Sequence, residues 1–429
     1  MLKNILFLKR ILLNTTLTVS FLLGSFASSA FATTLKEALK IALETNSQII
    51  ATRQSLTAQS ENINQIAASN YPNITANILS NKAWDLRNSD DSSNLSADIT
   101  ANYMLFDGNH TQYNLIAEKL RLNSIETELL GVEQQVLFDS IVAYLNVLKD
   151  IRLVELSNKN VVVLKQQLDA ASSRYELGEV TITDVAQATA ALEAATSVLV
   201  SREGALNLSQ SFFETIVGIK AIDLDSNIEL PVLPEALEVA KKIAESSNLD
   251  LKSNFFAEKR AKALWDASRA KSLPTINLST SINGGEMSSN NEYSNFGITF
   301  RGSVPIYSGG ALKSREREAY SFLETAMTNT VITRLNVMQK VMTAWSDFEV
   351  TTAVINARFR QVEATELAHK GILEEARLGS RTTLHVLESE QELMNAKTDL
   401  ETAISDRLVA AYRLLMETGT LTPASLGLN

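Results

Sequence analysis

The chain has 429 residues and a formal net charge of −10, and it contains no cysteine. Nucleic-acid binding depends on clustered Lys and Arg, so an acidic chain without a basic block argues against a nucleic-acid partner. The lack of cysteine excludes disulfide scaffolds, thiol catalysis and cysteine-ligated zinc. With only 6 prolines and 16 glycines, long regular elements are expected.

The N-terminal segment 1–32 has the parts of a secretory signal peptide. Basic residues precede an apolar run over 11–23, and residues 30–32 are Ala-Phe-Ala, an A-x-A cleavage site. We therefore expect an exported protein whose signal is removed after residue 32. The alternative, a retained anchor, is disfavoured because the run is shorter than the ~20 residues that a spanning helix needs.

The rest of the chain is a tandem duplication of a unit of roughly 200 residues, which predicts one fold made of two similar halves. The stretch that begins at Leu177-Gly178 recurs at Leu378-Gly379. Other landmarks recur at nearly the same offset: Asn46 with Asn248, Pro72 with Pro274, and Gly108 with Gly309. The predicted organisation is a first repeat, a linker, a second repeat and a C-terminal tail, over 33–218, 219–233, 234–419 and 420–429.

Each repeat begins with a predicted helix followed by a β-hairpin. In the first repeat, apolar residues at helical spacing predict helices over 35–71, and Tyr71-Pro72 ends the helical region. The period then changes to two, and two alternating segments around a polar loop predict a hairpin over 73–106. The second repeat has the same pattern, with a helix over 234–271 and a hairpin over 275–307.

The hairpins alternate between apolar and polar residues, which fits strands with lipid on one side and water on the other. Aromatic residues near the strand ends also fit a membrane interface. A half-buried sheet of a soluble protein shows the same alternation, and Lys82 on the apolar face fits only if it lies above the lipid. The polar residues proposed to line a barrel lumen are Asn77, Asp98, Thr100, Ser279, Ser281 and Arg301.

Four strands cannot close a barrel, since about eight is the smallest number whose interior side chains fit. Open sheet edges are not tolerated in lipid, so the chain is expected to oligomerise. The residues themselves permit either a dimer with eight strands or a trimer with twelve.

Long helices follow each hairpin. Leucine and valine recur every seven residues after Leu115, which predicts coiled-coil packing in a helix over 109–175. At ~1.5 Å per residue this helix would be about 100 Å long. A return helix is predicted over 181–217, and the second repeat has the equivalents at 310–376 and 382–418. We expect these helices to pack on one another and on neighbouring subunits.

With these features the chain resembles the TolC family of outer-membrane efflux and secretion channels, in its type I secretion branch. The resemblance covers essentially all of the sequence after residue 32. It rests on the duplication and on an ordered set of motifs: Pro72 and Pro274 entering the hairpins, Leu105-Phe106-Asp107-Gly108 and Val304-Pro305-Ile306-Tyr307-Ser308-Gly309-Gly310 leaving them, and Leu177-Gly178-x-x-Thr181-x-x-Asp184-Val185 and Leu378-Gly379-x-Arg381-Thr382 at the helix turns.

The resemblance implies an α+β membrane fold. Three identical chains would form a twelve-stranded outer-membrane β-barrel, continued by a long α-helical barrel across the periplasm. The periplasmic tip would be closed at rest and would open when a periplasmic adaptor (a membrane fusion protein) docks with an inner-membrane ABC or proton-driven pump. Outer-membrane lipid is the other implied partner, and no cofactor or metal is implied.

In the family, polar links near the two helix turns hold the tip closed, which assigns Asp184 and Arg381 to the gate together with Thr181 and Thr382. Asp184 has an alternative role in a capping box with Thr181, where a helix N-terminus favours an acidic residue. Arg381 precedes a helix N-terminus, where a cation is unfavourable. It is therefore expected either to have a carboxylate partner or to be solvated.

His385 and Glu388 are also assigned to the gate, one helical turn apart. Under three-fold symmetry each would form a ring, and a Glu388 ring would attract cations. His385 is expected to be neutral because it lies near a helix N-terminus, and a metal-binding ring of His385 is a minor alternative. The family often has a tyrosine where this chain has Ala376, so one gate contact is missing or replaced.

Gly178 and Gly379 are predicted left-handed turn residues. In the family the adjacent grooves receive the adaptor, which assigns Gly178, Gly379, Leu177 and Leu378 to adaptor docking. His110 and His369 are expected only to lie at the surface.

The predicted function is a passive outer-membrane exit channel of a tripartite efflux or type I secretion system. The alternative is a structural coiled-coil envelope spacer or a trimeric surface stalk. An enzyme is not expected, because no catalytic triad, metal triad or phosphate-binding loop is present in the sequence. The cargo cannot be identified from the residues, although the missing lipid-anchor cysteine favours the secretion branch.

Overall fold

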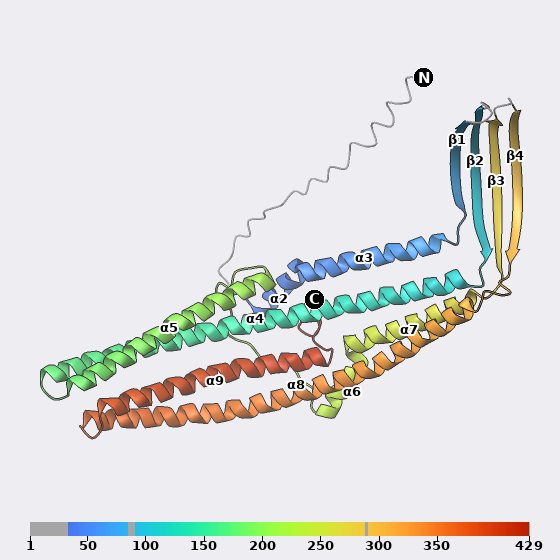
Figure 1. The fold of residues 1–429 in the computed structure, drawn as a ribbon. Coiled ribbons are helices and arrows are strands. Elements are labelled where there is room, and N and C mark those ends of the chain that lie inside the picture. Colours follow the sequence, from blue (N-terminus) through green and yellow to red (C-terminus); the bar gives the residue numbers. More distant parts are fainter. Residues whose placement is uncertain (1–32, 85–90, 288–290, 429) are drawn as a thin grey trace.

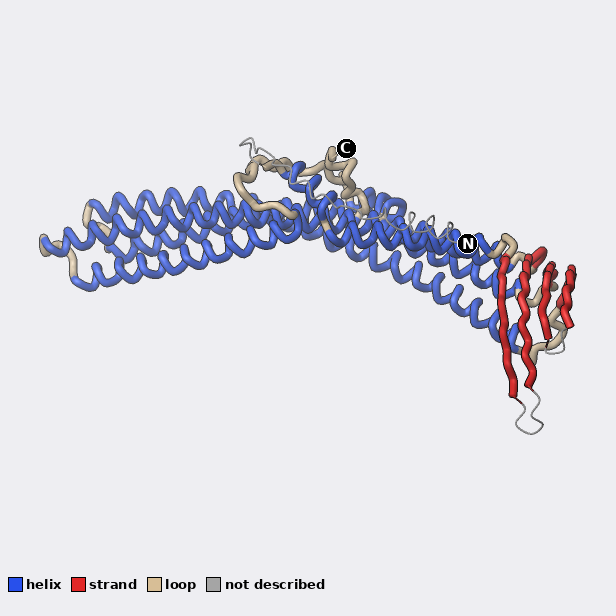
Figure 2. Tube along the Cα trace, turned by 90° about the horizontal axis from the view of Figure 1, so that it is seen from above, coloured by secondary structure: helices blue, strands red, loops and turns tan. Residues whose placement is uncertain are grey.

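The computed structural model describes residues 33–84, 91–287 and 291–428, so the predicted signal peptide lies outside the described residues. Figure 1 shows an elongated molecule in which the helices run along one axis and the four strands stand together at one end. Figure 2 shows the loops gathered at mid-length and at the two ends of this helical body. Within the described residues, none of the helices combines the length and the apolar character needed to cross a membrane.

The two repeats contain the same six elements in the same order. The first has α2 (Leu35–Thr45), α3 (Ser47–Ala68), β1 (Asn73–Trp84), β2 (Asp91–Phe106), α4 (His110–Glu176) and α5 (Ile182–Val217). The second has α6 (Leu237–Ser247), α7 (Leu249–Ala270), β3 (Thr275–Met287), β4 (Asn291–Ser303), α8 (Ala311–Arg377) and α9 (Thr383–Glu417).

The offset between the repeats changes once, inside the hairpin. It is 202 for α3 and α7, which run from 47 to 68 and from 249 to 270. It is 201 for α4 and α8, which run from 110 to 176 and from 311 to 377. The second hairpin unit is therefore one residue shorter than the first.

The helical region predicted over 35–71 consists of two helices, α2 and α3, which are separated at Asn46. This residue has extended backbone angles (φ −66, ψ 125), and its side chain caps α3 by accepting a hydrogen bond from the Gln48 amide at 2.9 Å. The predicted helix over 234–271 is likewise divided at Asn248, which caps α7. Asparagine competes with the helical ladder for backbone hydrogen bonds, which favours it at such breaks.

The sheet is antiparallel with the order β1-β2-β3-β4, so pairing between β2 and β3 joins the two hairpins. The second hairpin ends earlier than predicted, at Ser303. Pro305 follows closely, and a proline cannot donate to a strand ladder. Each of the outer strands, β1 and β4, is paired on one side only among the described residues.

The core surrounds α4. Tyr144 is fully buried against Phe213 of α5, and its hydroxyl lies 2.8 Å from the Thr33 carbonyl oxygen and 2.9 Å from that of Asp225. A second cluster joins α4 to the other repeat, where Leu137 and Ile141 pack with Leu415 of α9. The helix α4 therefore holds both repeats together.

Candidate functional site

The proposed lumen residues all lie on one face of the sheet. Residues directly opposite each other in an antiparallel ladder share a face. The register pairs Asn77 with Asp98 and pairs Asp98 in turn with Asn283. Thr100 pairs with Ser281, and Arg301 joins the same face through Asn277 on β3. The amide of Asn77 donates to the Asp98 carboxylate at 2.9 Å, which bridges β1 and β2 on this face.

The opposite face of the sheet is apolar and exposed. Side chains on it include Ile78, 81% exposed, and Phe300, 70% exposed. The apolar face extends on β3 from Ile276 to Gly284, which is eight residue steps or about 27 Å along the strand at ~3.4 Å per step. That length matches the ~25 Å apolar band of outer-membrane barrels.

Charged residues mark one end of this apolar band. Glu286 and Glu292 are directly opposite each other on the apolar face near the hairpin loops. Lys82 is at the same end of β1, with its Nζ 5.3 Å from the centre of the Trp84 ring. Ionised groups are costly in the bilayer interior, so the loop end of the sheet lies outside the apolar band, as the position of Lys82 requires.

At the far end of the helical body, α4 and α5 are joined by a first tip turn, residues 177–181. Gly178 has φ +74, which favours glycine. The backbone amide of Thr181 donates to the Asp184 carboxylate at 2.9 Å, and the Thr181 hydroxyl lies 2.7 Å from the same oxygen. Hydrogen bonds from Thr181 lower the pKa of Asp184. Asp184 therefore forms the capping box that begins α5.

The second tip turn, residues 378–382, joins α8 to α9. Arg381 donates from Nε to Glu375 at 2.7 Å, so its carboxylate partner within the chain is at the end of α8, next to its own turn, rather than at Asp184. Thr382 begins α9 without a side-chain cap, and its hydroxyl lies 2.7 Å from Nδ1 of His385. Glu388 is exposed on the next turn of the helix.

Both tip turns expose a leucine. Leu177 is 76% exposed and Leu378 is 83% exposed, and each precedes a glycine with positive φ. Nothing approaches within 4 Å of a Cβ built at Gly178 or Gly379. Each tip turn therefore exposes one leucine to solvent, and the backbone of the glycine that follows it is accessible.

The expectation that His369 is a simple surface residue is wrong. Its Nε2 lies 3.0 Å from the Glu390 carboxylate and its Nδ1 lies 2.9 Å from the Ser389 hydroxyl, and only 13% of its side chain is exposed. His110 is also partly buried, with Nδ1 2.9 Å from the carbonyl oxygen of Ala267. His110 links α4 to α7, and His369 links α8 to α9. The sequence around each histidine has no pattern that identifies its partner.

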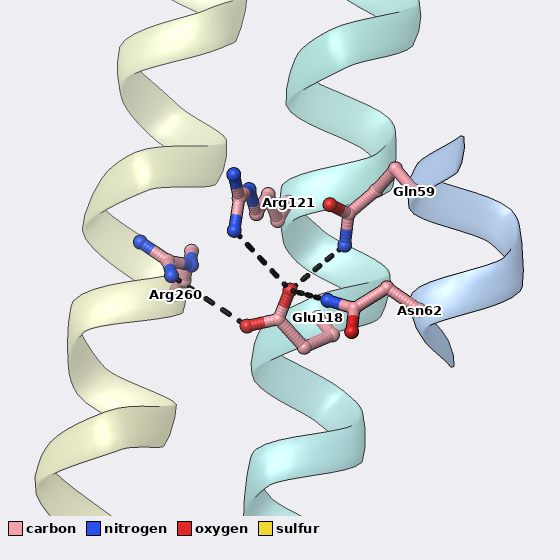
Figure 3. Close-up of polar contacts among 5 residues, drawn as sticks. All are labelled: Gln59, Asn62, Glu118, Arg121 and Arg260. Carbon is pink, nitrogen blue, oxygen red and sulfur yellow. Dashed lines mark hydrogen bonds and ion pairs between the residues drawn. The ribbon is translucent and has the colours of Figure 1, made fainter. Parts of the chain in front are cut away.

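Sequence reasoning also missed a polar cluster at Glu118, shown in Figure 3. Its carboxylate accepts a hydrogen bond from Gln59 of α3 at 2.8 Å and lies 3.6 Å from Arg260 of α7. Asn62 and Arg121 approach at 3.3 and 3.8 Å. The Glu118 side chain is 12% exposed, so one carboxylate fixes three helices near the strand-bearing end.

A metal centre is absent from the part of the chain that the structure describes, where no group of three or more His, Asp or Glu side chains could hold an ion. The two tip turns and the polar sheet face are the features that the sequence analysis singled out, and they lie at opposite ends of the molecule (Figure 1).

Comparison with known proteins places these features in a family. The family model described as "Outer membrane efflux protein" matches residues 38–218 and 242–420, which are the two repeats. The chain is 31% identical over 412 residues to the outer membrane efflux protein BepC of Brucella suis, covering 94% of this chain and 88% of BepC. It is 24% identical to the outer membrane protein TolC of Escherichia coli, covering 94% and 86%.

The fold agrees with a solved channel structure. The structure of CusC, a protein that forms a transmembrane channel, superposes with a TM-score of 0.83 over 90% of this chain and 92% of CusC, at 17% identity. The family model matched over both repeats and the identity to BepC show that the chain belongs to the outer membrane efflux protein family.

Proposed function

We propose that three copies of this chain form the exit channel of a tripartite efflux or type I secretion system, and that an adaptor and an inner-membrane pump open its periplasmic tip. The family is one of outer-membrane exit channels. The observation that carries the proposal is the four-stranded sheet with one polar face and one exposed apolar face, at the end of a long helical body.

The number of copies follows from the size of the barrel. Four strands from one chain leave two edges, and lipid tolerates no open edge. A ring of about eight strands has an interior that side chains fill, which would leave no path for cargo. Twelve strands from three copies leave an open lumen, lined by the polar face that includes Asn77, Asp98 and Arg301.

The polar sheet face also favours a channel over the alternative spacer or stalk. A stalk would need an apolar sheet face to anchor it, but it would not need polar residues aligned on the other face. Here Thr75 and Thr100 are 2.7 Å apart across that face, next to the hydrogen bond between Asn77 and Asp98. The matched family model and BepC are both named for outer-membrane efflux, and no enzymatic activity is proposed.

For the tip, we assign Asp184, Thr181, Arg381, Thr382, His385 and Glu388 to the closed gate in the assembled channel. Arg381 and Glu375 are each about half exposed, and exposed ion pairs contribute roughly 0–1 kcal/mol. Arg381 can therefore exchange Glu375 for Asp184 of a neighbouring copy at little cost. The adaptor docks beside the exposed Leu177 and Leu378, where Gly178 and Gly379 permit close backbone approach.

The proposal is tested by reconstitution. Detergent-purified protein is sized by light scattering and then inserted into planar lipid bilayers, where single-channel current is recorded. We expect a trimer and discrete conductance steps that remain small until the tip is opened. A monomer in detergent that adds no current to the bilayer contradicts the proposal.

A further inference from the structure

We infer that a cavity at the junction of the helices with the sheet binds the zwitterionic headgroup of an ethanolamine phospholipid. The cavity has a volume of about 450 Å³ and lies between the C-terminal end of α7 and the first turns of α4 and α8. That volume is within the ~300–1,000 Å³ range of small-ligand sites. The inference requires the sheet to lie in the outer membrane, but it does not depend on conduction.

The cavity lies at the end of the apolar sheet face, where α4, α7 and α8 meet the strands (Figure 1). Its residues include Gly108, two positions after β2 ends, and Leu273, two positions before β3 begins. The apolar face ends beside them, at the paired Phe106 and Ile276, which are 42% and 41% exposed. A lipid whose acyl chains cover this apolar pair would therefore place its headgroup at the cavity.

Two cations and two carboxylates line the cavity. Arg269 and Asp266 come from α7, whereas Lys313 and Glu316 come from α8. The four charges sum to zero, and both signs are present. A headgroup with one phosphate and one ammonium matches this set, because the phosphate can pair with the cations and the ammonium with the carboxylates. An anionic headgroup without an ammonium would leave both carboxylates unmatched.

Both cations are available to a phosphate. The Arg269 side chain is 56% exposed, and its guanidinium nitrogens lie 3.8 Å from Asp266 and 3.7 Å from Glu316. Charge-assisted hydrogen bonds are ~2.7–2.9 Å long, so neither carboxylate holds the guanidinium tightly. Lys313 has no ion-pair partner in the part of the chain that the structure describes. It lies in the first turn of α8, where the helix dipole disfavours a cation, and a bound phosphate would offset that cost.

The carboxylates favour a primary ammonium over a quaternary one. Carboxylate oxygens accept hydrogen bonds from the N–H groups of a primary ammonium, whereas a choline headgroup has no N–H to donate. Asp266 and Glu316 have side chains that are 25% and 37% exposed, so these hydrogen bonds would form in a partly desolvated site. The hydroxyls of Tyr113 and Ser272 also line the cavity and can donate to the phosphate.

The duplicated fold does not itself require these four charges. The first repeat packs α3 on α4 as the second packs α7 on α8. In the first repeat the positions equivalent to Asp266, Arg269, Lys313 and Glu316 are Asn64, Ala67, Gln112 and Leu115, and none of them is charged. A charge set that is present in one copy of a duplicated unit and missing from the other indicates a role beyond the packing of the two helices.

Native mass spectrometry of the detergent-purified protein measures lipid binding. Phosphatidylethanolamine, phosphatidylcholine and phosphatidylglycerol with identical acyl chains are added in equal amounts. We expect phosphatidylethanolamine to be retained at least about fivefold more than either other lipid, since both lack the hydrogen bonds of its ammonium. Equal retention of the three lipids, or a preference for either other lipid, overturns the inference. Inorganic phosphate is added alone in a separate arm, and displacement of the lipid by it also overturns the inference.

Substitutions in the cavity test the role of each charge. Lys313→Gln should lower the retention of phosphatidylethanolamine by about tenfold, the effect of one lost charge-assisted hydrogen bond. The matched control Lys165→Gln removes an exposed lysine of α4 outside the cavity and should leave retention unchanged. The double variant Asp266→Asn with Glu316→Gln keeps the cations and should shift the preference to phosphatidylglycerol. An equal loss in the control, or an unchanged preference in the double variant, contradicts the assigned site.

Discussion

Arg174 and Glu375 occupy the same position in the two repeats, 201 residues apart, and carry opposite charges. Arg174 pairs with Glu179 at 3.3 Å in the first tip turn, and Glu375 pairs with Arg381 at 2.7 Å in the second. The two turns are thus closed by ion pairs of reversed polarity. In the proposed ring of three chains these turns would alternate, so that ion pairs of opposite polarity would lie next to each other.

Replacing Arg381 with alanine is expected to make the channel leak. Each lost exposed pair shifts the closed–open equilibrium by about 1.4- to 5-fold, at 0.2–1 kcal/mol, and symmetry multiplies the effect over three copies. Single-channel conductance and the antibiotic sensitivity of cells measure it. Glu375→Gln is the matched control, because it removes only the partner within the turn. If the control leaks as much as Arg381→Ala, Arg381 does not act through a neighbouring copy.

The start of α5 is expected to loosen in acid. Hydrogen bonds from Thr181 lower the pKa of Asp184 below its usual 3.8. A depressed pKa contributes stability that is present above the unfolded-state pKa and is lost as pH falls through the folded-state value. The protection factors of the first α5 amides, which correct for the intrinsic pH dependence of exchange, should therefore fall below about pH 4.

A substitution at Thr181 tests whether the acid dependence of α5 comes from its N-terminal cap or from the charge of Asp184 alone. Thr181→Ala removes the N-cap side chain and should cost about 1 kcal/mol at neutral pH, with most of the acid dependence lost as well. Protection of the first turn of α5 that stays constant from pH 6 to pH 3 in the natural protein would refute the capping role.

Glu118→Ala is expected to destabilise the strand-bearing end of the helical body. The substitution leaves Arg260 and Gln59 without their carboxylate partner in a site where Glu118 is 12% exposed. Loss of one partner in such a cluster costs about 2–3 kcal/mol. The denaturant midpoint and hydrogen exchange in α3 and α7 measure the loss.

Glu126, an exposed residue on the same helix, is the matched control position for Glu118. Glu126→Ala changes the net charge equally, and Glu126 is exposed, so it should shift stability by less than about 0.5 kcal/mol. Equal effects of the two variants would show that the Glu118 cluster has no particular role in stability.

Arg301→Ser is expected to make the channel more cation-selective. Arg301 and Asp98 both lie on the polar sheet face, so three copies in the proposed channel would place opposite charges around the lumen. Removing the cations leaves the carboxylates to attract cations and repel anions. The reversal potential in a salt gradient should move toward that of the cation, and Asp98→Asn should move it the other way. Unchanged reversal potentials in both variants would place these residues outside the conduction path.

Local patterns determined much of this protein from the sequence. The change of period from helical to two and the Thr181 capping box each depend on residues close together in the chain, and the duplication is visible because such local patterns recur about 200 residues apart. Side-chain period alone assigned Asn77 and Arg301 to the polar face of their strands. Asn46 and Asn248 were identified as matching landmarks, but not as helix breaks, because an asparagine interrupts a helix only where its side chain finds a backbone partner.

Only the tertiary structure decided which distant groups meet. Glu118 lies 59 residues from Gln59 and His369 lies 20 from Ser389, and no periodicity encodes either contact. The pairing of β2 with β3, which turns two hairpins into one sheet, also joins segments from different repeats. Sequence period specifies which face of an element is apolar, whereas the choice of partner depends on shape and on buried polar groups that are satisfied only when the elements come together.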